Sequence, residues 1–159
     1  MNHDKVSDHF NSSNYLADSS DRISIRQGLV KDFLGRCMNV HILDIGCGDG
    51  SLSLPMLNRS NQLTLVDISK KMLDEAKNNI PEEFKDNVTV VNDSFESIKD
   101  DGRYDVVICI GVIAHVPDVD RLWRKIGFVL KKGGLLIVET TPNPYPLGKL
   151  LKPYYYIRG

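Results

Sequence analysis

The sequence has little of what disulfide-linked, metal-binding or membrane-spanning proteins usually carry. Its 159 residues include three cysteines, Cys37, Cys47 and Cys109, which form no C-x-x-C pair. An odd number of widely spaced cysteines argues against disulfides and zinc, so we expect no metal site and a reduced, cytoplasmic chain. The longest apolar stretch, around residues 106–114, is far shorter than the roughly 20 residues of a membrane helix, so we expect no membrane span.

The chain also lacks an excess of charge of one sign. It has 20 Lys and Arg residues against 21 Asp and Glu residues, and its formal net charge at pH 7 is −1. Without a basic stripe, the sequence predicts neither nucleic acid nor an anionic membrane as a partner. The hydrophobic share of 42% and the charged share of 26% are those of an ordinary globular protein, and the length suits about one domain.

Short apolar runs rich in Val and Ile alternate with segments of helical period. The runs predict buried strands at residues 40–45, 63–66, 88–91, 104–110 and 135–139. Between them, Ser69 predicts the N-cap of a helix that ends at Pro81, and a later helix is predicted to carry Lys131 in its last turn and to end at Gly133-Gly134. This alternation predicts an α/β fold, a Rossmann-like three-layer αβα sandwich with a mostly parallel sheet.

The two ends of the chain differ from its middle in composition. Residues 1–20 are polar and rich in Ser, Asn and Asp, which predicts a flexible segment or one that folds over a ligand. Residues 142–159 are rich in Pro and Tyr and predict a loop or lid, the start of a substrate cap. The predicted domain therefore spans residues 21–141, and an amphipathic helix around residues 25–34 precedes its first strand.

The turn after the first predicted strand carries three glycines, Gly46, Gly48 and Gly50. Glycines let the backbone turn sharply and approach a ligand closely, and the N–H groups of the helix expected after the turn would face that ligand. The G-x-G-x-G spacing differs from the G-x-G-x-x-G fingerprint of dinucleotide-binding folds, and no Gly-Lys-Ser/Thr follows as in a P-loop. A plain tight turn is the alternative.

Two carboxylates indicate the charge of the ligand. Asp44 directly precedes the loop, where a carboxylate would repel a pyrophosphate but suits a cation. Asp67 ends the second strand, where it can accept hydrogen bonds from both hydroxyls of a ribose. Both predict a nucleoside with a positive end and no phosphate, which is the shape of S-adenosylmethionine. Alternatively, Asp44 caps a helix or pairs with a lysine, and Asp67 caps the next helix alongside Ser69.

Several segments resemble, in order, the motifs of class I S-adenosylmethionine-dependent methyltransferases. They are residues 42–53, 65–73, 92–94, 104–108 and 130–135. The resemblance is closest to the small-molecule group that includes ubiquinone- and menaquinone-biosynthesis-like enzymes. It implies in-line transfer of a methyl group from S-adenosylmethionine to a small-molecule acceptor, with S-adenosylhomocysteine as product.

The resemblance also implies a cofactor-binding site. Its residues would be Asp44, Gly46, Cys47, Gly48, Gly50, Asp67, Ile68, Met72, Asp93, Ser94, Cys109 and Gly111, with Tyr15 folding over the cofactor. The glycines would border the methionine moiety, Asp44 its amino group, Asp67 the ribose, and Ile68 and Asp93 the adenine. Read from the residues alone, Asp93 could instead form an Asx-turn, and Cys109 could be ordinary core.

His115 is the candidate catalytic residue. Methyl transfer depends mainly on proximity and alignment, and a general base helps where the acceptor must lose a proton. His115 follows the fourth strand at the edge where open α/β sheets bind ligands, and histidine titrates near neutral pH. The alternative is that His115 only shapes its loop. Arg22 and Arg26 could meet the cofactor carboxylate, but an exposed helix face is the favoured interpretation for both.

The predicted sheet is incomplete for the family, whose full fold has seven strands with the last one antiparallel. The sequence predicts five strands, for which the resemblance implies the order 3-2-1-4-5, with strands six and seven missing. We expect the exposed edge of the fifth strand to be covered by the tail, a homodimer partner or another chain. Two rival functions remain: a truncated, non-catalytic binding or partner subunit, and a nicotinamide-dependent oxidoreductase, against which the early third glycine argues.

Overall fold

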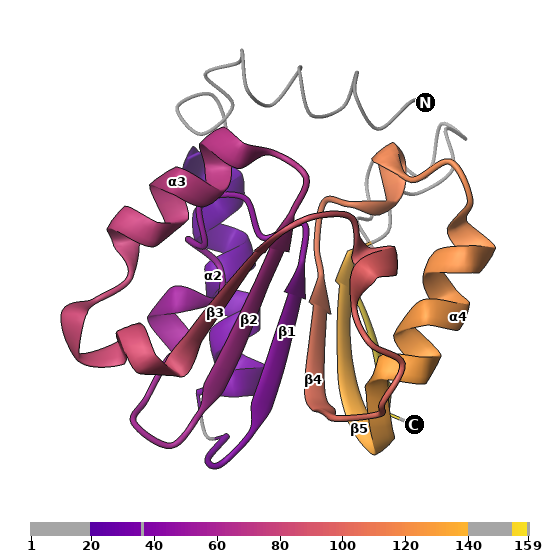
Figure 1. Cartoon of the computed structure of the whole chain (residues 1–159). Coiled ribbons are helices and arrows are strands. Elements are labelled where there is room, and N and C mark those ends of the chain that lie inside the picture. Colours follow the sequence, from indigo (N-terminus) through magenta and orange to yellow (C-terminus); the bar gives the residue numbers. More distant parts are fainter. Residues whose placement is uncertain (1–19, 36, 140–153, 159) are drawn as a thin grey trace.

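The computed structural model describes residues 20–35, 37–139 and 154–158. Tyr15, the predicted N-terminal segment up to residue 19 and most of the predicted cap lie outside the described residues. Figure 1 shows a twisted sheet flanked by helices on both faces. The helices are α2 (Ser20–Leu34), α3 (Lys70–Asn79) and α4 (Val119–Val129), and the strands are β1 (His41–Ile45), β2 (Gln62–Asp67), β3 (Val88–Asn92), β4 (Tyr104–Cys109), β5 (Leu130–Glu139) and β6 (Tyr154–Arg158).

The strand order is β3-β2-β1-β4-β5-β6. The first five strands are parallel in the predicted order 3-2-1-4-5, which confirms the Rossmann-like fold. A sixth strand was not expected: β6 pairs antiparallel with β5, from Leu135–Arg158 to Glu139–Tyr154, so the end of the tail is a strand and not a loop or lid. The tail itself thus covers the edge of the fifth strand, and a homodimer or a partner chain stays a prediction.

The sheet is buried on both faces because its strands are apolar at almost every position. One face packs with α2 and α3 around Ile42, Leu63 and Val106, and the other packs with α4 around Leu43, Val66 and Val107. Consecutive residues of a strand point to opposite faces, so a parallel sheet covered on both sides needs such continuous apolar runs.

Local signals placed α3 correctly. Its N-cap is Ser69, whose side chain accepts a hydrogen bond from the Met72 N–H at 3.2 Å, and its C-cap is Ile80, directly before Pro81. Met72, Leu73 and Ala76 form its buried face, as the helical spacing predicts.

Two local predictions were wrong. First, α4 ends at Val129, and Leu130 is already extended and pairs with Tyr104, so β5 begins before the glycine pair. The Lys131 ammonium lies 2.8 Å from an Asp105 carboxylate oxygen instead of capping the helix. Second, only the 3-10 helix Leu54–Met56 follows the glycine loop. The loop therefore opens no α-helix of its own, and Pro55 lies in the first turn of the 3-10 helix.

Candidate functional site

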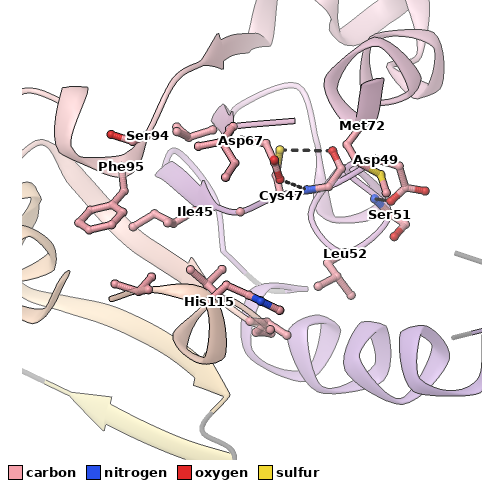
Figure 2. A pocket seen from close by; sticks show the side chains of 18 of the residues that line it. Ile45, Cys47, Asp49, Ser51, Leu52, Asp67, Met72, Ser94, Phe95 and His115 are labelled. Carbon is pink, nitrogen blue, oxygen red and sulfur yellow. Dashed lines mark hydrogen bonds between the residues drawn. The ribbon is translucent and has the colours of Figure 1, made fainter. Parts of the chain in front are cut away.

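A pocket opens at the carboxyl ends of β1, β2 and β4. It encloses about 1100 Å³ of non-atom space, open solvent included. Most of the predicted site residues come together here (Figure 2). Those that line it are Gly46, Cys47, Gly48, Asp67, Ile68, Met72, Asp93, Ser94, Gly111 and His115.

The glycine loop has a backbone that other residues adopt only with strain. Gly46, Gly48 and Gly50 have φ angles of 67°, 56° and 76°, in the left-handed region where glycine has no Cβ penalty. A Cβ on Gly46 would also lie 2.4 Å from Val112 Cγ2, so the β1 turn and the loop after β4 approach too closely for a side chain. The Gly46 N–H donates to the Val66 carbonyl at 2.8 Å, which fixes the turn against the end of β2.

Replacing Gly46 by alanine is therefore expected to destabilise the domain. The left-handed backbone alone costs about 1–2 kcal/mol for an L-residue, and the contact with Val112 adds to that cost. The matched control is Gly28→Ala in α2, where an added Cβ meets nothing within 4 Å. That change should raise the free energy of unfolding by about 0.4–1 kcal/mol. Urea unfolding followed by circular dichroism measures both, and equal effects of the two substitutions would contradict the loop argument.

Asp67 ties the end of β2 to the glycine loop. Its carboxylate accepts hydrogen bonds from the Gly48 N–H at 2.9 Å and from the Ser69 N–H at 2.8 Å. Burial raises the pKa of Asp67, and the backbone donors of Ser69, Gly48 and Ile68 partly oppose that rise. An ionised carboxylate has about four acceptor positions, so the backbone contacts leave capacity for a ligand at the pocket wall. The helix-capping alternative is met only in part, because the N-cap of α3 is Ser69.

Asp44 lies beneath the loop and not in the pocket wall. It is 1% exposed, and its Oδ2 atom has no hydrogen-bond partner within the described residues. Burial is the main reason that the pKa of this carboxyl rises to about 7; Asp67 and Asp49 also raise it, and the adjacent Ser53 hydroxyl lowers it. No lysine among the described residues pairs with Asp44 and it caps no described helix, so neither alternative from the sequence is met. A direct contact with a ligand stays a prediction.

Two further predicted residues lie elsewhere than expected. Gly50 faces the core, where an added Cβ would lie 2.6 Å from Leu54 Cδ1. Cys109 is fully buried in the core on the α4 face, where burial raises the pKa of its thiol to about 12. Both are packing residues of the fold rather than part of the pocket wall. Sequence spacing could not separate them from their neighbours because strand and loop residues alternate in direction.

Asp93 and Ser94 follow β3 and reach the same pocket. The Asp93 side chain accepts a hydrogen bond from the N–H of the next residue, Ser94, at 2.7 Å, whereas the Asx-turn alternative would need a donor two residues on. Asp93 is exposed and lines the pocket, so a ligand there can reach it.

His115 lies on the other side of the pocket from Asp67 in Figure 2. It ends the 3-10 helix Ile113–His115, and its backbone N–H donates to the Val112 carbonyl at 2.9 Å. The wall around it is apolar, formed by Ile23, Val112, Val116 and Pro117. The pocket therefore has a polar end at Asp67 and an apolar end at His115.

Arg26 is a pocket residue that the sequence analysis placed wrongly. Its side chain is 13% exposed and pairs with Glu139 at the end of β5, so it does not lie on an exposed helix face. It lines the pocket beside Gly111, where a Cβ would lie 3.5 Å from Arg26 Nη2. The signal was present in the sequence: Ile23, Arg26, Val30 and Leu34 share one helical face, and Val30 and Leu34 are core. The side chain of Arg22 lies outside the described part of the chain.

Other kinds of site are not found in the part of the chain that the structure describes. No group of three or more His, Cys, Asp or Glu side chains among these residues could hold a metal ion. None of the described helices combines the length and apolarity needed to cross a bilayer.

Comparison with known proteins agrees with this geometry. A family model described as a methyltransferase domain matches residues 43–138, which run from β1 through β5. The chain belongs to the class I S-adenosylmethionine-dependent methyltransferase family. The match begins in the strand that carries Asp44 and includes the glycine loop, Asp67 and His115.

Individual relatives of this methyltransferase domain are also methyltransferases. The chain is 32% identical, over 83% of its length and 54% of the relative, to the ubiquinone biosynthesis O-methyltransferase of Pelagibacter ubique. Among solved structures it resembles magnesium protoporphyrin IX methyltransferase of Synechocystis PCC 6803 with bound S-adenosylmethionine, with a TM-score of 0.67 and 26% identity over 89% of this chain and 76% of that one. It also resembles Haemonchus contortus phosphoethanolamine N-methyltransferase 2 in complex with S-adenosyl-L-methionine. The TM-score is 0.64 and the identity 28%, over 74% of this chain and 28% of that one. The chain spans about half the length of the curated relatives it matches.

Proposed function

We propose that this chain binds S-adenosylmethionine in the pocket and transfers its methyl group, in line, to a small-molecule hydroxyl, with S-adenosylhomocysteine as the second product. The observation that carries the proposal is the charge pattern of the pocket. A carboxylate, Asp67, lies at one end, a guanidinium, Arg26, lies at the wall beside Gly111, and no lysine follows the glycine loop. This pattern suits a ribose and an amino-acid end without phosphate.

The residues present fit such a ligand. At Gly48 a Cβ would meet nothing within 4 Å, so the loop leaves open space in which a ligand can approach the backbone closely. Asp44 has an unpartnered buried oxygen directly beneath it, which favours a cationic group above the loop. Asp67 would hold the ribose hydroxyls, Ile68 and Asp93 the adenine, and Arg26 the carboxylate. When bound, S-adenosylmethionine supplies an electrophilic methyl group on a positively charged sulfur.

The acceptor side of the pocket supports a hydroxyl acceptor with an apolar body. The walls around His115 are apolar, and they would exclude water and align the acceptor, which is the main source of rate in such a displacement. His115 would accept the proton that a hydroxyl loses. The name of the Pelagibacter relative, an O-methyltransferase, supports oxygen as the acceptor atom. A cytoplasmic location rests on the free cysteines and stays a prediction.

Calorimetric titration of the 159-residue chain with S-adenosylmethionine, S-adenosylhomocysteine and NADH tests the proposal. We expect both sulfur nucleosides to bind and NADH not to bind. Binding of NADH in their place would favour the oxidoreductase alternative. Binding without turnover on any of a panel of small phenols and aliphatic alcohols would favour the alternative of a non-catalytic partner subunit.

Replacing His115 by glutamine is expected to lower kcat by about 100-fold or more on a hydroxyl acceptor, since general-base catalysis contributes about 10²–10⁴-fold. Affinity for S-adenosylhomocysteine should not change, because His115 faces the acceptor end. The matched control is His41→Gln, an exposed histidine at the opposite edge of the sheet. Transfer of a radiolabelled methyl group to the best phenol of the panel measures kcat, and an unchanged kcat would leave His115 with a loop-shaping role only.

A further inference from the structure

The Arg26–Glu139 ion pair joins the wall of the pocket to the end of the central sheet. Arg26 comes from α2 and Glu139 is the last residue of β5, and each side chain is 13% exposed. Arg26 lines the pocket, whereas Glu139 lies behind it. The Arg26 guanidinium lies against Gly111: a Cβ built on Gly111 would be 3.5 Å from Arg26 Nη2.

Glu139 is more firmly held than Arg26. It sits on a strand with hydrogen-bonded neighbours on both sides, β4 and β6. Arg26 reaches the pocket on a long side chain with several rotatable bonds, and fixing such a side chain costs about 1.5–2 kcal/mol of conformational free energy. The helix that carries it is itself anchored at the next residue, where the Gln27 side-chain amide donates to the Ser51 carbonyl at 2.8 Å.

A guanidinium that is in an ion pair can also bind a second anion. A guanidinium has five N–H donors in a fixed plane, and Nη2 is the nitrogen that faces Glu139. A carboxylate ligand in the pocket would meet a guanidinium whose position is already set, so less conformational entropy is lost on binding. An Arg side chain without Glu139 would have to be ordered by the ligand itself.

We propose that Glu139 is a positioning residue for the cofactor site: it holds the Arg26 guanidinium beside Gly111, where it binds the carboxylate at the amino-acid end of the S-adenosyl ligand. This inference rests on the proposed function, and it extends the site to a residue at the end of β5 that does not touch the ligand. Glu139 acts through Arg26, so its loss should affect only ligands that have a carboxylate.

The test compares two ligands that differ at this end. S-adenosylhomocysteine carries the amino-acid end, and 5′-methylthioadenosine has the same adenine, ribose and sulfur without it. In Glu139→Gln, which keeps the size of the side chain and removes its charge, we expect S-adenosylhomocysteine to bind about five- to tenfold more weakly, because charge-assisted contacts are roughly twice as strong as neutral ones. Affinity for 5′-methylthioadenosine should stay the same.

Two further variants separate positioning from stability. Glu139→Asp keeps the charge and should restore part of the lost affinity. In an Arg26→Met background, Glu139→Gln should have no further effect, because the two residues act as one unit. The matched control is Asp100→Asn, which breaks the Asp100–Lys125 pair, whose lysine is 12% exposed. That change should leave the affinity for both ligands unchanged.

Calorimetry on the full chain, with circular dichroism to verify folding, gives outcomes that differ clearly. If Glu139→Gln weakens the binding of both ligands equally, the inference is overturned in favour of a purely structural role. Stronger binding of S-adenosylhomocysteine would overturn it by showing that Glu139 competes with the ligand for Arg26, and unchanged binding would show no role. Failure of the wild-type chain to bind S-adenosylhomocysteine would instead overturn the proposed function, and the inference with it.

Discussion

Replacing Asp67 by alanine is expected to weaken binding of S-adenosylhomocysteine at least about 100-fold. A hydrogen bond to a charged group contributes about 1.5–3 kcal/mol, and two ribose hydroxyls would donate to this carboxylate. A loss of about 3 kcal/mol corresponds to about 100-fold in Kd. The substitution also frees the Gly48 and Ser69 N–H groups from their acceptor, so the glycine loop loses its tie to β2. Calorimetric titration of the variant measures the change in Kd.

Two matched variants show which part of the loss comes from the ligand. Asp67→Asn keeps one acceptor oxygen for the loop, so it should lose less affinity for S-adenosylhomocysteine than Asp67→Ala does. Asp93→Ala removes a carboxylate from the same pocket, but one that is exposed and bound only to the neighbouring Ser94 N–H. We expect a smaller effect of about threefold, since exposed polar contacts contribute well under 1.4 kcal/mol. A larger loss for Asp93 than for Asp67 would contradict the assignment of the ribose to β2.

The free energy of unfolding of the unliganded chain is expected to depend on pH through Asp44. Burial raises the pKa of this carboxyl from an ordinary value of 3.8 to about 7 in the folded state. Between these values the folded chain binds more protons than the unfolded chain, so its stability falls as pH rises. The loss begins near pH 4 and is complete above about pH 7. Its full size is about 4 kcal/mol, because each pH unit between the two pKa values contributes about 1.4 kcal/mol.

Asp44→Asn isolates this effect because it cannot ionise. Urea unfolding at several pH values between 4 and 8 should find the variant similar to the wild type near pH 4 and more stable near pH 8. Carboxyls that do not interact with Asp44 cancel in the difference, including Asp105, whose pKa is raised by burial but lowered overall by the His41 N–H and Lys131. A difference between variant and wild type that does not change with pH would contradict a buried, ionising Asp44.

The same variant tests whether the buried charge serves the ligand. We expect Asp44→Asn to bind S-adenosylhomocysteine more weakly near pH 8 although its fold is more stable, because the ammonium of the amino-acid end loses a nearby negative charge. Such a trade-off between stability and function is common at active sites.

The sequence by itself determined the first five strands and the glycine loop. Apolar runs of strand length, the cap at Ser69 and the spacing of the glycines are local signals, and each acts over a few residues. The order 3-2-1-4-5 was implied by the resemblance to class I methyltransferases, and the structure has that order. Asp67 was predicted to bind a ribose because it ends the second strand, where a carboxylate can accept hydrogen bonds from both hydroxyls.

Only the tertiary structure decided which of these side chains meet in the pocket. Arg26 and Glu139 lie on elements at opposite ends of the domain sequence, and their contact depends on how α2 packs on one face of the sheet. Gly50 and Cys109 do not line the pocket, although they belong to the motifs that form it. The direction in which each residue points decides what it contacts, and both point into the core. The strand β6 was equally hidden, since an edge strand is stabilised by the backbone groups of its partner and leaves a weak pattern in its own sequence.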